Sequence, residues 1–210
     1  MENTLTLNPA EKAVVNRNQT FLKTWQTNHI LANVLGMGLL HTAISHTITG
    51  PHGVTLTPAE FIMHTISLFV FSFILNLLQN KALQLKFERK NFADLGYFLV
   101  FIPAAFWVGY YTLYIPFDIL FMYLAIGGIN AFRLKKYFAN GGKWAWQIML
   151  SLLVGAVVGI GAGFAAYYGF IKDIQGIAAD FVLWLVITVP ASITYAAISK
   201  VFLQQQLKQE

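Results

Sequence analysis

The chain has 210 residues, of which 57% are hydrophobic, 15% aromatic and 11% charged, and its formal net charge at pH 7 is +5. One soluble core cannot bury so many apolar side chains, whereas a helical bundle in a bilayer can leave them against lipid. The composition therefore excludes an ordinary soluble protein, and the lack of cysteine excludes disulfides, thiolate metal sites and cysteine nucleophiles. We expect an all-α integral membrane protein.

The first 28 residues precede the first long apolar run and lack the basic, apolar and small-residue order of a cleaved signal peptide. Asn8, Pro9 and Glu11 are typical of a helix start, with a cap, a proline at the first position and an acid in the first turn. We expect residues 1–28 to be a cytoplasmic or interfacial segment whose short helix places apolar side chains against lipid. These are Val14, Val15, Phe21, Leu22 and Trp25.

Six apolar runs approach or exceed the length of about 20 residues that a helix needs to cross a bilayer. They cover residues 30–49, 61–80, 95–115, 117–132, 146–171 and 177–199. The fourth run is short, but Arg133, Lys135 and Lys136 follow it and can extend it by reaching to the interface. We therefore expect a transmembrane domain of six helices over residues 29–202 and a cytoplasmic tail at 203–210.

Lysine and arginine gather on one side of this predicted bundle. Three precede the first run, four follow the second and four follow the fourth, whereas Lys172 is the one basic residue in the other connections. The positive-inside rule then places both termini in the cytoplasm. The positive net charge is therefore an orientation signal and does not indicate nucleic-acid binding. We expect a multi-pass protein of a bacterial inner membrane.

The short outer connections divide the runs into three helical hairpins, at residues 30–80, 95–138 and 146–202. The second helix of each hairpin opens with a small residue or proline and then an acid, which predicts an internal repeat of about 60 residues. The acids are Glu60 in TPAEF, Asp118 in IPFDI and Asp180 in IAADF. Each acid either stabilises the unpaired amides of its helix start or faces an outer vestibule that attracts cations or exchanges protons.

Small residues and prolines mark two of the hairpins. Gly155, Gly159 and Gly163 stand four residues apart, which predicts close packing against a helix of the same chain or of a second copy. A hinge or a substrate-lining role is the alternative for this stripe. Pro103 and Pro190 each remove a backbone donor and predict helix kinks, and kinked helices often line the path in transporters.

All five histidines lie between residues 29 and 64. His41 and His46 are five residues apart, about 140° around a helix, so they do not chelate one ion, and we predict no metal or other cofactor. Glu60 and His64 share a helix face, His46 lies near the same outer end, and His41 lies near the bilayer centre. These residues are candidates for a proton relay or pH-sensitive gate. The alternatives are polar helix packing and, behind it, a metal or haem ligand.

The segment RKNFADLGYFLVFIPAAFW, residues 89–107, carries a resemblance. Its Lys90, Asn91, Ala93, Asp94, Tyr97, Phe101 and Pro103 resemble the start of the third helix in the small bacterial alanine exporters, and GIAADFVLWLVITVP resembles their acid-then-proline helix. The hairpin pattern more distantly resembles the antimicrobial-efflux proteins built from tandem transmembrane pairs. The resemblance covers some 50 residues. It implies a small-solute exporter with Asp94 and Asp180 as site residues.

The motifs of hydrolases, intramembrane proteases and phosphate-binding enzymes are absent, so we do not expect an enzyme. The sequence predicts a proton-coupled exporter of a small amphiphilic or amino-acid-like solute. Its transport and proton-relay candidates are His41, His46, Glu60, His64, Asp94, Asp118 and Asp180. The alternatives are a membrane accessory or assembly subunit without transport and a lipid-modifying membrane enzyme. Expected partners are the lipid bilayer, the solute, and a second copy or a membrane complex.

Overall fold

A computed structural model of the chain describes residues 8–41, 57–87, 94–113, 117–138, 141–174 and 176–207. Among these residues the secondary structure is helical and no strand occurs. Helix α1 (Pro9–Asn33) continues without a break into a π-helical segment, η1 (Val34–His41). The other helices are α3 (Pro58–Phe87), α4 (Leu95–Leu113), α5 (Phe117–Lys135), α6 (Gly141–Gly169) and α7 (Ile177–Leu207), with a 3₁₀ turn, η2 (Ile171–Asp173), before α7.

Four of these helices are long and apolar enough to cross a membrane. The qualifying stretches are Pro58–Phe87, Leu95–Thr112, Trp146–Gly169 and Ala178–Leu207. The protein is therefore an all-helical chain with several helices compatible with membrane spans. Six crossings and cytoplasmic termini stay predictions.

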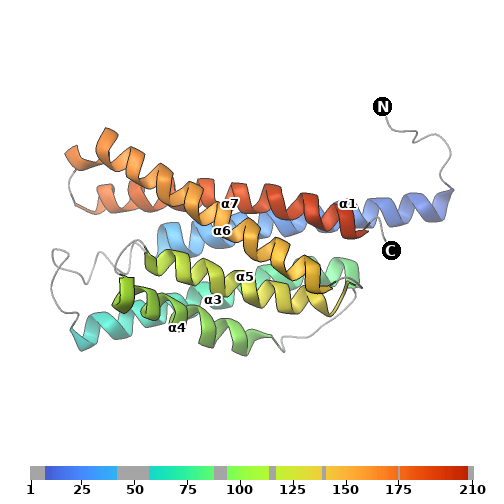
Figure 1. Ribbon diagram of the computed structural model, residues 1–210, viewed down its shortest axis with the longest axis horizontal. Coiled ribbons are helices and arrows are strands. Elements are labelled where there is room, and N and C mark those ends of the chain that lie inside the picture. Colours follow the sequence, from blue (N-terminus) through green and yellow to red (C-terminus); the bar gives the residue numbers. More distant parts are fainter. Residues whose placement is uncertain are drawn as a thin grey trace.

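The helices form a closed ring. Each packs against the next in chain order, in the sequence α1, α3, α4, α5, α6 and α7, and α7 packs back against α1. Neighbours around the ring run in opposite directions, so the start of α1 and the end of α7 lie at the same end of the elongated bundle (Figure 1). We call this the basic end, because Lys86, Lys135 and Lys136 lie there at the ends of α3 and α5.

The exterior of the bundle carries many large apolar side chains. Large apolar residues face outward on several helices: Val100 is 61% exposed, Trp146 74% and Val157 59%. Polar residues such as Asn76 and Asn130 are buried in the interior. The interior is mostly apolar but contains these polar residues, and an exterior this apolar is stable in lipid and unfavourable in water. The fold thus agrees with a bundle embedded in a membrane.

Helix α1 begins as predicted but does not rest on lipid as predicted. Asn8 accepts a hydrogen bond from the Glu11 N–H, and Glu11 accepts one from the Asn8 N–H, which completes a capping box. Val14 and Val15 are exposed, but Phe21, Leu22 and Trp25 are buried. The expectation of lipid contact for these three is wrong because α1 continues through the boundary at residue 28 and packs against α3 and α7.

The glycine stripe of α6 lies against α7. A side chain at Gly155 would place its Cβ 2.6 Å from the Ala191 carbonyl oxygen, and one at Gly163 would approach Ile187 Cγ1 to 2.5 Å. At Gly159 it would overlap the Ile187 carbonyl. The stripe therefore lets two helices of the same chain approach to backbone contact. Of the prolines, Pro103 lies inside α4 and Pro190 inside α7.

Candidate functional site

Arg133 is the most unusual residue of the interior. It lies near the end of α5, and its side chain is fully buried. Its Nε donates to Asp94 Oδ2 at 3.2 Å, its Nη1 to Gln79 Oε1 at 3.1 Å and its Nη2 to Asn80 Oδ1. The expectation that Arg133 reaches out to the interface is therefore wrong, since it lies on the face of α5 that points into the ring.

Asp94 connects this buried cation to the surface. It stands directly before α4, where its carbonyl accepts the Tyr97 N–H in the first turn. Its second carboxylate oxygen, Oδ1, accepts from Lys136 Nζ at 3.3 Å, and the Lys136 side chain is 43% exposed. A buried ion pair is a weak source of stability, because desolvation offsets the attraction. Within a membrane bundle, such a pair is a functional candidate by default.

A hydrogen-bonded chain continues from Arg133 to His29 on α1. Gln79 Nε2 lies 3.2 Å from His29 Nδ1. A guanidinium has donors only, so the Gln79 oxygen must face Arg133 and its amide nitrogen must face His29. His29 Nδ1 is then the acceptor, which makes the ring neutral with its proton on Nε2. That Nε2 is buried and has no partner among the described residues.

Further unpaired polar atoms lie beside this chain. The Tyr195 ring packs 3.9 Å from the His29 ring, and its hydroxyl lies near Trp25, Asn130 and Ser199 without a well-formed hydrogen bond to any of them. Trp25 Nε1 and both amide atoms of Asn130 also lack partners in the described part of the chain. An unpaired buried polar group costs about 1–3 kcal/mol, so a small rearrangement of these side chains or a bound polar molecule would stabilise this part of the interior.

We call this group of side chains the polar centre. It comprises Trp25, His29, Gln79, Asn80, Asp94, Asn130, Arg133 and Tyr195, from α1, α3, α5, α7 and the start of α4. The Phe98 ring covers the guanidinium, with its centroid 5.0 Å from Arg133 Cζ. The polar centre thus combines a buried cation, its carboxylate partner, aromatic walls and unpaired donors.

Three other predicted site residues, Glu60, His64 and Asp180, lie away from the polar centre. Glu60 caps α3: its Oε2 accepts the Thr57 N–H at 2.5 Å, and the Glu60 N–H donates to Thr57 Oγ1 at 3.3 Å. His64 is buried one turn further, 6.1 Å from the Trp107 ring. Asp180 is partly buried in the first turn of α7. Glu60, His64 and Asp180 all lie toward the end opposite the basic end, because α3 and α7 begin there.

Three predicted residues cannot be placed by their side chains. His46 lies outside the described residues, and for His41 and Asp118 the structure describes the backbone alone. Among the described residues, no three histidine, aspartate or glutamate side chains gather as metal ligands.

Sequence reasoning missed most of the polar centre. Its signal was the spacing of polar residues inside apolar helices: Asn76, Gln79 and Asn80 share one face of α3, and Asn130 and Arg133 share one face of α5. Arg133 was interpreted only as an orientation charge and as a side chain that reaches to the interface. A count of intramembrane polar residues by helix face would have identified these two helices.

Comparison of the chain with protein-family models, curated proteins and solved structures finds no match. The chemistry of the polar centre is therefore inferred from its geometry alone. In general a guanidinium matches the geometry of a carboxylate, and unpaired donors and acceptors match small polar groups.

Proposed function

We propose that the chain is a small membrane transporter for an amino-acid-like solute, whose carboxylate binds to Arg133. The observation that carries this proposal is the polar centre, where a fully buried guanidinium lies beside unpaired buried polar atoms. It lies inside a ring of helices with an apolar exterior. A ring of this kind offers a route for a solute that the surrounding lipid excludes.

The geometry suits a carboxylate with a short apolar or polar remainder. A guanidinium presents a planar set of donors that matches a carboxylate, and Asp94 already accepts from its Nε. The solute carboxylate would therefore compete with Asp94 for Arg133. Asn130, Trp25 and the Tyr195 hydroxyl would bind the polar groups of the solute, and the Phe98 ring would cover its apolar part.

This competition supplies the proposed coupling to protons. A proton on Asp94 removes the charge that holds Arg133, so a proton and a solute carboxylate favour each other's binding. Proton and solute then travel in the same direction, and export down a solute gradient carries protons outward. The outward direction rests on the resemblance to small exporters. The sequence predicted both Asp94 and Glu60 as candidates for proton coupling. In this proposal Asp94 carries the coupled proton, because the Glu60 carboxylate caps α3.

The test uses purified protein in liposomes that contain a mixture of the twenty amino acids and a pH-sensitive dye. Mass spectrometry measures which amino acids leave, and the dye reports the accompanying protons. The decisive variant is the double substitution Asp94→Leu with Arg133→Leu, which removes both buried charges together and so retains the fold. The matched control is Lys135→Leu, which removes one exposed basic charge at the same end.

We expect the wild type and Lys135→Leu to release one class of amino acids with protons and the double variant to release none. Size-exclusion chromatography and circular dichroism establish that all three proteins are folded. Wild-type flux that survives in the double variant would refute carboxylate binding at Arg133. Absence of amino-acid and proton flux with a folded wild-type protein would favour the alternative of an accessory subunit.

A further inference from the structure

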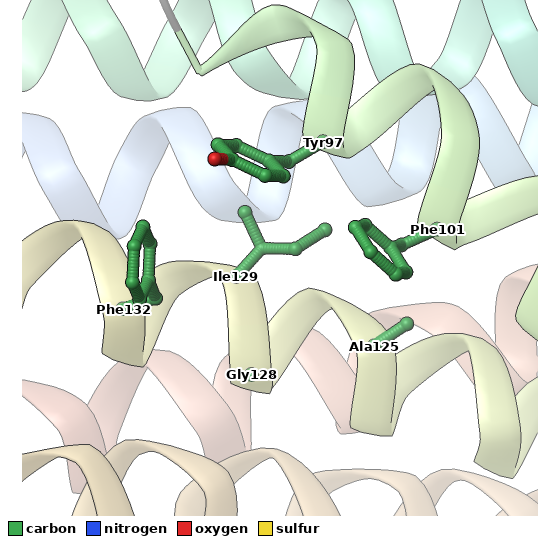
Figure 2. A pocket seen from close by; sticks show the side chains of 6 residues that line it. All are labelled: Tyr97, Phe101, Ala125, Gly128, Ile129 and Phe132. Atoms are coloured by element: carbon green, nitrogen blue, oxygen red, sulfur yellow. The ribbon is translucent and has the colours of Figure 1, made fainter.

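A shallow apolar groove of about 360 Å³ opens on the outer face of the bundle between α4 and α5. Its lining residues are Tyr97, Phe101, Ala125, Gly128, Ile129 and Phe132. Figure 2 shows Tyr97 and Phe101 from α4 and Phe132 from α5 around the groove, with Ile129 between them and Gly128 on the α5 side. The rings of Tyr97, Phe101 and Phe132 are all substantially exposed.

The dimensions of the groove suit part of a hydrocarbon chain. Ala125 and Phe132 are seven residues apart on α5, which is about 10 Å along the helix axis. No heavy atom lies within 4 Å of where a Cβ on Gly128 would be, so the groove is open at that position. On the lipid-facing surface of a membrane bundle, the apolar molecule that reaches such a groove is a lipid acyl chain.

One end of the groove is positively charged. Lys136 Nζ lies 4.9 Å from the centroid of the Phe132 ring, and Lys135 is exposed beside it. Asp94 accepts one hydrogen bond from this ammonium group, which has three donors. Basic side chains next to an apolar groove at the membrane interface complement the phosphate of an anionic lipid.

We propose that the groove between α4 and α5 binds an anionic phospholipid, with an acyl chain between Tyr97 and Phe132 and the phosphate at Lys136. This site adjoins the polar centre through the bond from Lys136 to Asp94, but it does not depend on transport. It requires only that the apolar face of α4 and α5 meets lipid.

Native mass spectrometry of the purified chain in detergent tests the proposal. Phosphatidylglycerol and phosphatidylcholine with identical acyl chains are titrated separately, and the fraction of lipid-bound protein is measured. Gly128→Leu fills the groove, and Gly161→Leu is its matched control, because neither glycine has a heavy atom within 4 Å of its Cβ position. Lys136→Gln removes the charge, and Lys172→Gln removes one at the opposite end.

We expect the wild type to bind phosphatidylglycerol more tightly than phosphatidylcholine. Gly128→Leu weakens binding of both lipids, whereas Lys136→Gln weakens only phosphatidylglycerol, by about fivefold for one basic contact. Both control variants bind like the wild type. Equal lipid binding by Gly128→Leu and Gly161→Leu would overturn the proposal that the groove binds lipid. Loss of a dimer in Gly128→Leu without any change in lipid binding would show that a second copy occupies it.

Discussion

The Asp94–Arg133 pair predicts a strong and testable coupling between two substitutions. Asp94→Leu leaves a fully buried guanidinium without its carboxylate, and Arg133→Leu leaves the buried carboxylate with Lys136 alone. Either single change therefore leaves a buried charge without its main partner. Replacing both residues by leucine removes both charges, and the remaining Lys136 is exposed enough to be solvated.

The expected magnitudes follow from the burial of the pair. Removing one partner of a buried ion pair costs about 3–5 kcal/mol. In a chain of 210 residues this lowers the melting temperature by roughly 6–20 °C. The double variant loses only the donors to the Gln79 and Asn80 oxygens, about 1–3 kcal/mol for each unpaired group. We therefore expect it to be no less stable than the worse single variant, with a coupling energy of at least about 3 kcal/mol.

Thermal unfolding of the four proteins in one detergent, followed by circular dichroism, measures this cycle. Lys136→Leu is the control, because it removes the exposed partner of Asp94 and is expected to shift stability by less than about 1 kcal/mol. The reasoning is refuted if the double variant loses as much stability as the two single variants together. That result would mean that the two side chains act independently and that the pair is not buried as described.

Three further predictions concern packing, the α3 cap and orientation. Gly159→Ala should destabilise the protein by about 1–3 kcal/mol through overlap with α7, whereas Gly161→Ala should stabilise it by up to about 1 kcal/mol. Equal effects of the two substitutions in thermal unfolding would contradict the close approach of α6 and α7. Glu60→Gln should preserve both the cap and the solute flux, since glutamine can complete a capping box. Loss of flux at unchanged stability would indicate that Glu60 takes part in proton transfer. The chain has no cysteine, so a single introduced cysteine reports which side of the membrane it lies on. Lys172→Cys should react with an impermeant maleimide on intact cells, and Lys12→Cys only after lysis. The reverse pattern would show that the termini lie outside the cell.

The sequence predicted features that depend on a few neighbouring residues. The start of α1 follows from Asn8 and Glu11, which lie three residues apart and cap each other. The acid at Glu60 was correctly associated with a helix start, one of its two interpretations, because a first-turn carboxylate needs only local amides. Because these signals depend only on neighbouring residues, they predict the helix starts whatever the arrangement of the helices in space.

The polar centre could not be predicted in the same way, because it depends on the rotation of each helix about its own axis. Arg133 near a helix end is equally compatible with an interfacial side chain and with a buried one. Its direction is decided by Gln79 and Asn80, more than fifty residues earlier in the chain. The burial of Trp25 likewise depends on α1 continuing past residue 28, which the apolar runs alone did not indicate.

The packing of the glycine stripe against α7 also positions one wall of the polar centre. Without a side chain at Gly155, α6 lies so close to α7 that a Cβ there would come within 3.3 Å of the Tyr195 backbone nitrogen and Cβ. This close approach holds Tyr195 where its ring packs 3.9 Å from the His29 ring. A larger residue at Gly155 would push α7 and Tyr195 away from α6 and thereby alter the wall of the polar centre. Close helix packing in this protein therefore also determines the shape of the site where we propose that the solute binds.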